Sequence, residues 1–301
     1  MDQITQLRAL CPDVEIRQGV SLSKFTTLRV GGPADCFAEA ETEKQIIRLM
    51  QGAKALGLEM LVLGNGSNLL VRDGGFRGLA IHIGRRFSAI ARTRDGLTAQ
   101  AGALLSTLSR TALEEGLSGL EFAQGIPGSV GGGVYMNAGA YGGELGKVIS
   151  SVRVLDGDQI KSVPAADMEF AYRHTRAMDE KWIVLSADFR LERGDPALID
   201  AAMRDYAARR RDKQPLEYPS AGSFFKRPAG HFAGALIEQA GLKGLTVGGA
   251  QVSEKHAGFL INIGNASASD FLSLMERVQN EVEKRFGVRL ENEVRIVGSE
   301  K

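Results

Sequence analysis

Apolar residues at helical spacing predict five helices. The clearest begins at Thr42, where a Thr-x-x-Gln pattern matches a capping box; apolar positions continue to Leu56 and Gly57 ends the helix. Asp195 followed by Pro196 predicts another helix start, because proline suits the first helical position. The expected helices cover residues 43–56, 104–115, 196–211, 232–239 and 270–286, the last of them capped by Ser267.

Short apolar runs between these helices predict strands at residues 60–63, 79–83, 152–155, 159–163, 182–191, 259–262 and 290–297. Asp156-Gly157 separates two of the runs and predicts a hairpin. In the last run, alternation places Glu291, Glu293 and Arg295 on one face. An exposed salt-bridge ladder is the reading that these residues alone favour. The alternative is a carboxylate and a guanidinium aimed at one ligand.

The charges of this 301-residue chain are balanced, with 37 Lys+Arg against 36 Asp+Glu. A phosphate backbone is bound mainly through an excess of clustered cations, so we expect no nucleic-acid partner. No apolar run approaches the length of a membrane span, and the start at Met1 lacks a signal region. We therefore expect no membrane insertion and a cytoplasmic location. A length near 300 residues predicts either two domains or one large α/β unit.

The cysteines and histidines are too scattered to suggest a metal centre. Cys11 and Cys36 form no metal-binding pair, so two reduced thiols are expected. The histidines stand at no ligand spacing; they are His82, His174, His231 and His256. We expect no metal site.

A glycine loop at Gly64–Asn68 directly follows the apolar run at 60–63. Such a loop lets backbone N–H groups approach a phosphate closely. The pattern lacks the third glycine of a Rossmann fingerprint and the Gly-Lys-Ser/Thr of a Walker loop. The sequence therefore indicates a phosphate cradle of neither type.

Glycines also crowd residues 116–146, where regular structure should largely lapse. Ser129 and Asn137 stand among these small residues, which suits a backbone lying flat against a planar ligand and its pyrophosphate. A surface loop or lid is the alternative. Two separate glycine-rich segments favour an extended nucleotide cofactor lying between two lobes.

Six motifs, in order, run from about residue 20 to residue 298. They are Thr27–Ala34, Leu63–Leu70, Gly125–Gly132, Tyr172-Arg173, Ala221–Lys226 and Glu293–Arg295. Together they closely resemble the UDP-N-acetylenolpyruvoylglucosamine reductase family, flavoenzymes of peptidoglycan precursor synthesis. The resemblance implies an α+β protein with a two-lobed FAD-binding domain of the vanillyl-alcohol-oxidase type. It also implies a C-terminal α+β domain that binds the UDP-sugar.

The implied domains are an N-terminal segment 1–18, an FAD-binding domain 19–212 and a substrate-binding domain 213–301. The lobes of the FAD-binding domain would cover about 19–86 and 87–212, and the last strand could return to the first lobe. By the same resemblance, the cofactor-binding residues are Gly64, Asn65, Gly66, Ser67, Asn68, Gly125, Pro127, Gly128, Ser129, Gly132 and Asn137.

The implied reaction uses NADPH to reduce FAD. The reduced flavin then passes a hydride from N5 to the enolpyruvyl methylene of UDP-N-acetylglucosamine enolpyruvate, which yields UDP-N-acetylmuramate. Arg173 and Glu293 match the positions that polarise the substrate carboxylate, where negative charge develops. Ser223 matches the proton donor to the adjacent carbon.

Four cations match segments that contact substrate or NADPH phosphates: Lys213, Lys226, Lys243 and Arg295. The cluster Arg209-Arg210-Arg211-Lys213 has another explanation, because the helix dipole favours cations at a helix C-terminus. The sequence departs from the family at Arg227, where asparagine is usual, so a substrate contact there is not carried over. The stretch between Arg190 and Tyr206 is too short for the tyrosine loop of one subclass, which indicates the shorter subclass.

Two other functions remain open on the residues alone. One is a different FAD-linked oxidase or dehydrogenase on the same fold. The other is a non-catalytic nucleotide-binding module that kept the glycine loops.

Overall fold

The computed structural model describes residues 3–300, which form two compact units. Unit 1 comprises residues up to 18, 36–65 and 78–209. Unit 2 comprises residues 19–35, 66–77 and those from 210 onward. Each unit is therefore built from segments that are far apart in the chain.

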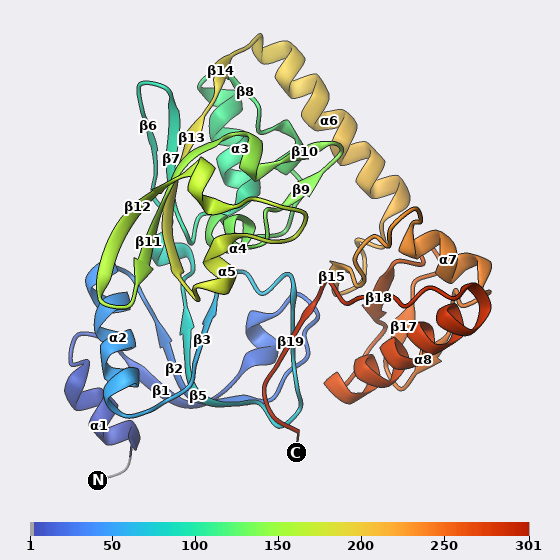
Figure 1. The fold of residues 1–301 in the computed structure, drawn as a ribbon, viewed down its shortest axis with the longest axis horizontal. Helices are drawn as coiled ribbons and strands as arrows, with labels where there is room; N and C mark the ends of the chain where they lie inside the picture. The colour runs from blue at the N-terminus through green and yellow to red at the C-terminus, as the bar shows by residue number, and fades with distance from the viewer. Residues whose placement is uncertain (1–2, 301) are drawn as a thin grey trace. The chain divides into compact units, whose positions relative to one another are not determined.

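The first sheet has the strand order β1-β2-β5-β3, and β3 runs parallel to β5 (Figure 1). Its strands are β1 (Ile16–Ser21), β2 (Pro33–Glu39), β5 (Phe76–His82) and β3 (Met60–Leu63). Helices α1 (Gln3–Leu10) and α2 (Glu43–Ala55) contribute Leu7, Ile46 and Leu49 to its core. Cys11 and Cys36 are buried in this core and are not joined in a disulfide.

Helix α2 starts where the sequence predicted, although its capping box is only half formed. Thr42 Oγ1 accepts a hydrogen bond from the N–H of Gln45 at 3.2 Å. The Gln45 side chain accepts from the N–H of Glu41 instead of that of Thr42. One of the two reciprocal bonds is therefore replaced by a bond to the preceding residue.

The second sheet of unit 1 is antiparallel, with the order β12-β11-β13-β7-β6. Its strands are β6 (Ile90–Arg92), β7 (Gly96–Gln100), β11 (Ile149–Asp156), β12 (Gln159–Pro164) and β13 (Ile183–Arg190). The hairpin predicted at Asp156-Gly157 joins β11 to β12. Helix α3 (Leu105–Glu114) packs on this sheet and ends before Gly116, close to its predicted bounds.

The glycine-rich stretch 116–146 contains only short elements, as predicted. They are β8 (Leu117–Ser118), α4 (Val130–Tyr135), β9 (Gly139–Ala140) and β10 (Gly143–Glu144). The remaining short elements of unit 1 are α5 (Arg176–Asp179) and β14 (Glu192–Arg193). Single 3₁₀ turns lie at Leu22–Phe25, Arg85–Phe87, Glu121–Ala123, Leu145–Lys147 and Ala165–Met168. Helix α6 (Pro196–Lys213) then leads into unit 2.

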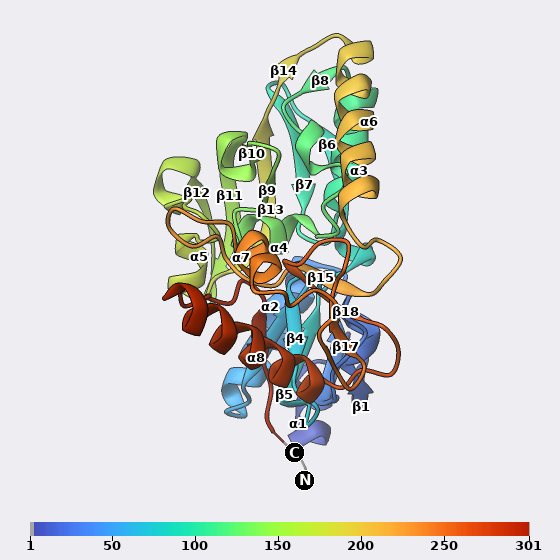
Figure 2. The same ribbon diagram turned by 90° about the vertical axis from the view of Figure 1, so that its right-hand side faces the viewer.

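Unit 2 has a four-stranded sheet in the order β15-β18-β17-β16. The strands are β15 (Ser220–Ser223), β16 (Thr246–Val247), β17 (Ala250–Val252) and β18 (Phe259–Asn262). Helices α7 (Ala233–Gln239) and α8 (Ala268–Phe286) cover it, and Figure 2 shows α8 along its length beside α7. The predicted cap Ser267 forms a complete capping box with Asp270.

A separate parallel pair in unit 2 joins β4 (Leu69–Val71) to β19 (Arg295–Val297). The long strand predicted for 290–297 is therefore wrong in extent, because only its last three residues form a strand. The N–H groups of Glu293 and Val294 both reach the carbonyl of Phe224, at 2.9 and 3.4 Å. Two donors on one acceptor interrupt a regular ladder, so the backbone before Arg295 is irregular.

Candidate functional site

Two of the predicted cofactor segments meet inside unit 1. The Asn65 side chain donates to the carbonyl of Pro127 at 2.5 Å. A Cβ atom added to Gly64 would stand 2.1 Å from Ser129 Oγ. Residues 128–131 run along 101–105, as the hydrogen bond from Leu105 N to Gly128 O at 3.0 Å shows. The loop after β3 and the segment before α4 are thus held against each other.

Ser129 supplies a polar atom that the fold itself does not use. Its side chain is 3% exposed, and Oγ has no hydrogen-bond partner within residues 3–300. A buried hydroxyl without a partner costs free energy unless a ligand or water satisfies it. Beside it, a Cβ on Gly132 would meet only Ser129 Oγ, at 3.7 Å. An unused hydroxyl next to open space at a glycine fits a polar group of FAD.

Asn137, by contrast, has both ends of its amide engaged by the protein. Nδ2 donates to the carbonyl of Ala171 at 3.0 Å, and Oδ1 accepts from the N–H of Gly146 at 2.9 Å. The side chain is buried, and the backbone takes a left-handed φ of 42°. The amide therefore ties three loops of unit 1 together, and direct cofactor contact by Asn137 stays a prediction.

The predicted cofactor residues Gly66, Ser67 and Asn68 belong to unit 2. Gly66 has a φ of +60°, and a Cβ there would stand 1.9 Å from the carbonyl oxygen of Phe25. The N–H of Thr27 also donates to the Gly66 carbonyl at 3.2 Å. The predicted reason for this glycine is access to a phosphate, but the close approach of the protein's own backbone is already sufficient to require it.

Ser223 and Glu293 lie on segments that are hydrogen-bonded to each other. Glu293 N–H donates to the carbonyl of Phe224, the residue after Ser223, at 2.9 Å. In the pairing of β15 with β18, Ser220 faces Ile261 and Ser223 faces Phe259, so β15 contains one extra residue. Gly222, with φ +74°, accommodates this bulge. Ser223 is exposed at the end of the strand, next to buried Phe224.

Arg173, the third predicted catalytic residue, belongs to unit 1. It ends a two-residue turn closed by hydrogen bonds between Ala171 and His174, at 3.0 and 3.3 Å. Its φ of +56° is uncommon for a residue with a side chain, and such backbone strain often marks a functional position. The guanidinium stacks on Tyr172 at 5.1 Å from the ring centre. Convergence of Arg173 with Ser223 and Glu293 stays a prediction.

The predicted substrate cations differ in what surrounds them. Lys226 pairs with Glu291 at 3.4 Å and Lys243 with Glu238 at 2.6 Å. Such partly exposed pairs contribute little free energy, so a phosphate could displace them. Lys213 is exposed at the last turn of α6, and Arg295 is exposed in β19. The departure at Arg227 places its guanidinium 4.5 Å from the centre of the Phe232 ring.

Two histidines, to which the sequence assigned no function, are linked to the segments that contain Gly64 and Ser223. Burial lowers the pKa of His82, and the backbone of Gly64 opposes this shift. Burial likewise lowers the pKa of His256, whose Nδ1 accepts the N–H of Gly258 at 3.1 Å. The Gly258 carbonyl in turn accepts the N–H of Phe224. No spacing rule links these histidines to the loops, because the contacts arise from tertiary folding.

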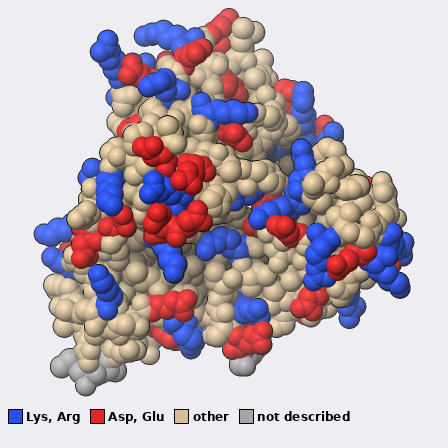
Figure 3. All heavy atoms as spheres, viewed as in Figure 1, with Lys and Arg blue, Asp and Glu red and all other residues tan. Residues whose placement is uncertain are grey.

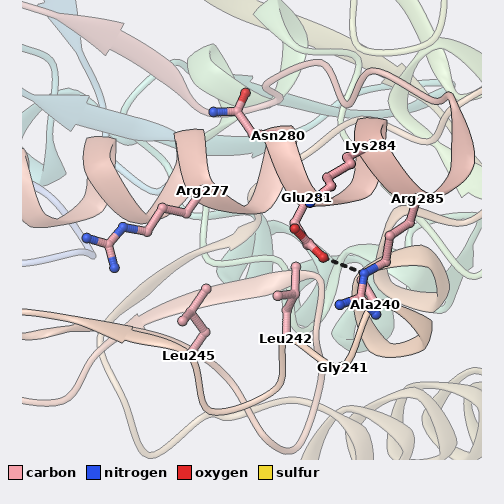
Figure 4. A pocket seen from close by; sticks show the side chains of 9 residues that line it. All are labelled: Ala240, Gly241, Leu242, Leu245, Arg277, Asn280, Glu281, Lys284 and Arg285. Atoms are coloured by element: carbon pink, nitrogen blue, oxygen red, sulfur yellow. Dashed lines mark hydrogen bonds and ion pairs between the residues drawn. The ribbon is translucent and has the colours of Figure 1, made fainter.

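A pocket elsewhere in unit 2 contains none of the predicted site residues (Figure 4). Leu242 and Leu245 line one side, and Arg277 and Lys284 of α8 line the other. An ion pair between Glu281 and Arg285 also lies there. We therefore do not assign the reaction to this pocket. On the face shown in Figure 3, acidic and basic side chains are interspersed.

No helix within residues 3–300 is both long and apolar enough to span a bilayer.

Comparisons with known proteins identify both parts of the chain. A family model described as an FAD-binding domain matches residues 34–159. Another, the C-terminal domain of UDP-N-acetylenolpyruvoylglucosamine reductase, matches residues 214–297. The fold and these matches define a flavoprotein with an FAD-binding module of the vanillyl-alcohol-oxidase type and a separate C-terminal domain. The predicted fold class is confirmed.

Full-length relatives identify the family. The chain is 48% identical over 291 residues to the UDP-N-acetylenolpyruvoylglucosamine reductase of Pediococcus pentosaceus, covering 96% of this chain and 97% of that one. It is 45% identical to the reductase of Listeria innocua, covering 99% and 100%. The crystal structure of the Thermus caldophilus reductase matches with a TM-score of 0.81 and 36% identity, covering 95% and 99%. The chain belongs to the UDP-N-acetylenolpyruvoylglucosamine reductase family.

A more distant structural relative shares the fold alone. The glucooligosaccharide oxidase of Acremonium strictum matches with a TM-score of 0.51 and 16% identity, over 95% of this chain and 59% of that one.

Proposed function

We propose that the chain reduces UDP-N-acetylglucosamine enolpyruvate to UDP-N-acetylmuramate with NADPH, using FAD, in the synthesis of peptidoglycan precursors. The observation that carries the proposal is the direct backbone bond between the Ser223–Phe224 segment and Glu293, in a member of this reductase family. We place the enzyme in the cytoplasm.

The residues that would hold FAD are those around the unused Ser129 hydroxyl, namely Gly64, Asn65 and the segment 125–132. When bound, FAD supplies two-electron chemistry: it takes a hydride from NADPH and gives it to the substrate. Buried Ser129 would bind a phosphate of the cofactor through its hydroxyl. The glycines beside it have no side chains and would let the backbone approach the phosphates closely.

Ser223 would donate the proton that completes the reduction. The bulge at Gly222 leaves Ser223 exposed while the flanking Phe224 is anchored in the core. A serine hydroxyl is a weak acid, so it can donate only to a strongly basic carbon held at hydrogen-bond distance. The carbon next to the substrate carboxylate becomes this basic after hydride addition to the neighbouring methylene.

Arg173 and Glu293 would stabilise the negative charge that spreads into the substrate carboxylate. A guanidinium can bind both carboxylate oxygens, and a protonated Glu293 can donate one further hydrogen bond. Lys213, Lys226, Lys243 and Arg295 would bind the phosphates of the UDP-sugar or NADPH. The functional domains are proposed as 19–212 for FAD and 213–301 for substrate, with β19 returning to β4.

The test is a pair of half-reactions followed by flavin absorbance without oxygen. NADPH should bleach the flavin, and the enolpyruvyl UDP-sugar should restore its colour. A different FAD-linked enzyme would bleach without this recovery, and a binding module would not turn over.

Ser223→Ala should retain FAD and its bleaching by NADPH. Recovery with the enolpyruvyl substrate should slow by about 10²–10⁴-fold, the size of a general-acid contribution. Ser273→Ala, at an exposed serine of α8, serves as the control and should recover at the normal rate. Normal recovery in Ser223→Ala would reject the proton-donor role.

A further inference from the structure

The irregular segment that carries Glu293 is held by groups from several other elements. The Gln279 side chain of α8 donates to the Leu290 carbonyl at 2.8 Å. The N–H of Lys226 donates to the Glu291 carbonyl at 2.8 Å. Because the segment lacks a regular strand ladder, these separate contacts determine where the Glu293 backbone lies.

Besides the bond from the Glu293 N–H to the Phe224 carbonyl, Asn68 also contacts the backbone at Glu293. Its Nδ2 donates to the Glu293 carbonyl at 3.0 Å, and its own carbonyl accepts the N–H of Arg295 at 3.1 Å. Asn68 is therefore hydrogen-bonded to the backbone on both sides of Val294.

The burial of Val294 determines how these two hydrogen bonds affect the Glu293 side chain. Val294 is 2% exposed and belongs to the core of unit 2. Glu293 is partly exposed and Arg295 is exposed, so these two charged side chains lie outside that core while Val294 between them lies inside it. Fixing the peptide between Glu293 and Val294 therefore fixes the direction in which the carboxyl leaves the backbone.

Asn68 itself is held firmly from both sides along the chain. Before it, Gly66 packs against the backbone of Phe25 and accepts the N–H of Thr27. After it, Leu69 begins β4, which pairs with β19 from Arg295 onward. A side chain anchored in this way can transmit the position of the loop 66–68 to Glu293.

We propose that Asn68 is a positioning residue for Glu293, so that the loop 66–68 sets the direction of the catalytic carboxyl. This inference rests on the proposed role of Glu293. It differs from the sequence-based expectation for Asn68, which was direct binding of FAD. The amide that would have faced the cofactor is instead bonded to the backbone of the acid.

Asn68→Ala removes the donor while the Glu293 backbone remains. Flavin recovery by the enolpyruvyl substrate should slow by about 10–100-fold, the effect of losing one partly buried hydrogen bond and the geometry it holds. FAD affinity, measured by quenching of free FAD fluorescence on titration into apoprotein, should change less than about threefold. Asn280→Ala removes an exposed amide of the same unit and should change neither quantity.

A double-mutant cycle with Glu293→Gln separates positioning from simple destabilisation. If Asn68 acts through Glu293, Asn68→Ala should add little once Glu293→Gln has slowed recovery. Multiplying effects, or lost FAD affinity with normal recovery in the loaded enzyme, would overturn the proposal. Asn68→Asp, an isostere without the donor, provides the same test if the alanine variant melts at a lower temperature.

The outcomes also separate this inference from the proposed function. Unchanged recovery in Glu293→Gln would reject the role of that carboxyl and the inference with it. Slow recovery in Glu293→Gln, with normal recovery in both Asn68 variants, would reject the inference alone.

Discussion

The Gly64 and Gly66 regions are neighbours in sequence, yet they differ in what their glycines make room for. At Gly64, the Ser129 side chain occupies the space that a Cβ would need, yet the Ser129 hydroxyl has no partner within the described chain and lies beside exposed Gly132. Around Gly66, the backbone of Phe25 occupies the space that a side chain would need. The first region has the properties of a ligand site, whereas the second has those of a tight internal contact. One glycine-rich motif thus combines two different physical requirements.

The largest expected effect is on folding, at Gly66. Gly66→Ala introduces an unfavourable backbone conformation and a clash with the Phe25 carbonyl, which together should cost about 2–5 kcal/mol of unfolding free energy. Urea unfolding of the apoprotein measures it. Gly57→Ala is the matched control, because Gly57 has a φ of +64° and no atom within 4 Å of the added Cβ. Equal losses in both variants would mean that the Phe25 contact is unimportant.

A smaller effect, confined to the cofactor, is expected at Gly132. Gly132→Ala lies in α4, where alanine favours the helix, and the new Cβ meets only Ser129 Oγ. The apoprotein should therefore keep its stability, while FAD affinity should fall by about 5–150-fold through crowding of the ligand. Fluorescence titration of apoprotein with FAD measures the affinity.

Gly131→Ala provides the contrast, since its Cβ would stand 2.8 Å from the side chain of Ala101. That variant should lose stability of the apoprotein. Unchanged FAD affinity in Gly132→Ala would show that FAD does not bind against this region.

The smallest effect expected is on the pH dependence of stability. Burial lowers the pKa of His82 in unit 1 and of His256 in unit 2 below the ordinary value of 6.5. The unfolded chain then binds more protons as pH falls below 6.5, so both histidines stabilise the fold above that pH. This contribution is lost as pH falls through the folded pKa. Glu39 opposes the shift at His82, and Arg17 adds to it.

Two substitutions assign this pH dependence to the units. His256→Asn keeps an acceptor for the Gly258 N–H without a titrating group, because asparagine can bond the N–H two residues on. His82→Gln likewise removes the titration beside Gly64. Urea unfolding between pH 8 and pH 5 should show a shallower loss of stability in each variant. An unchanged slope in both would contradict the assignment.

The elements that the sequence predicted well are those with strong local signals. The cap at Ser267, the Asp195-Pro196 helix start and the hairpin at Asp156-Gly157 depend on neighbouring residues, so the pattern is sufficient to find them. The run at 290–297 alternates equally clearly. It forms a strand only at its end, because distant Phe224 accepts two of its N–H groups.

In the candidate site, too, the sequence could not predict contacts between residues that are distant along the chain. Motifs identified the family, its fold class and the segments that matter. They could not show that Asn137 binds two loops, that Asn68 binds Glu293, or that Lys226 and Lys243 pair with glutamates. A motif shows that a particular residue type is required at a position. It does not show which atoms, far away in the sequence, contact that residue in the folded protein. The close approach of Gly66 to the Phe25 carbonyl could not be found from the motif either, and FAD binding by Gly66 stays a prediction.

The pairing of β4 with β19 also bears on how the chain is made. Leu69 to Val71 are translated long before their partners, Arg295 to Val297, which lie 226 residues further along the chain. Closing so long a loop is a slow, entropically costly step. Until it closes, Leu69 to Val71 present an unpaired strand edge, and such an edge is a place where a partly folded chain can aggregate.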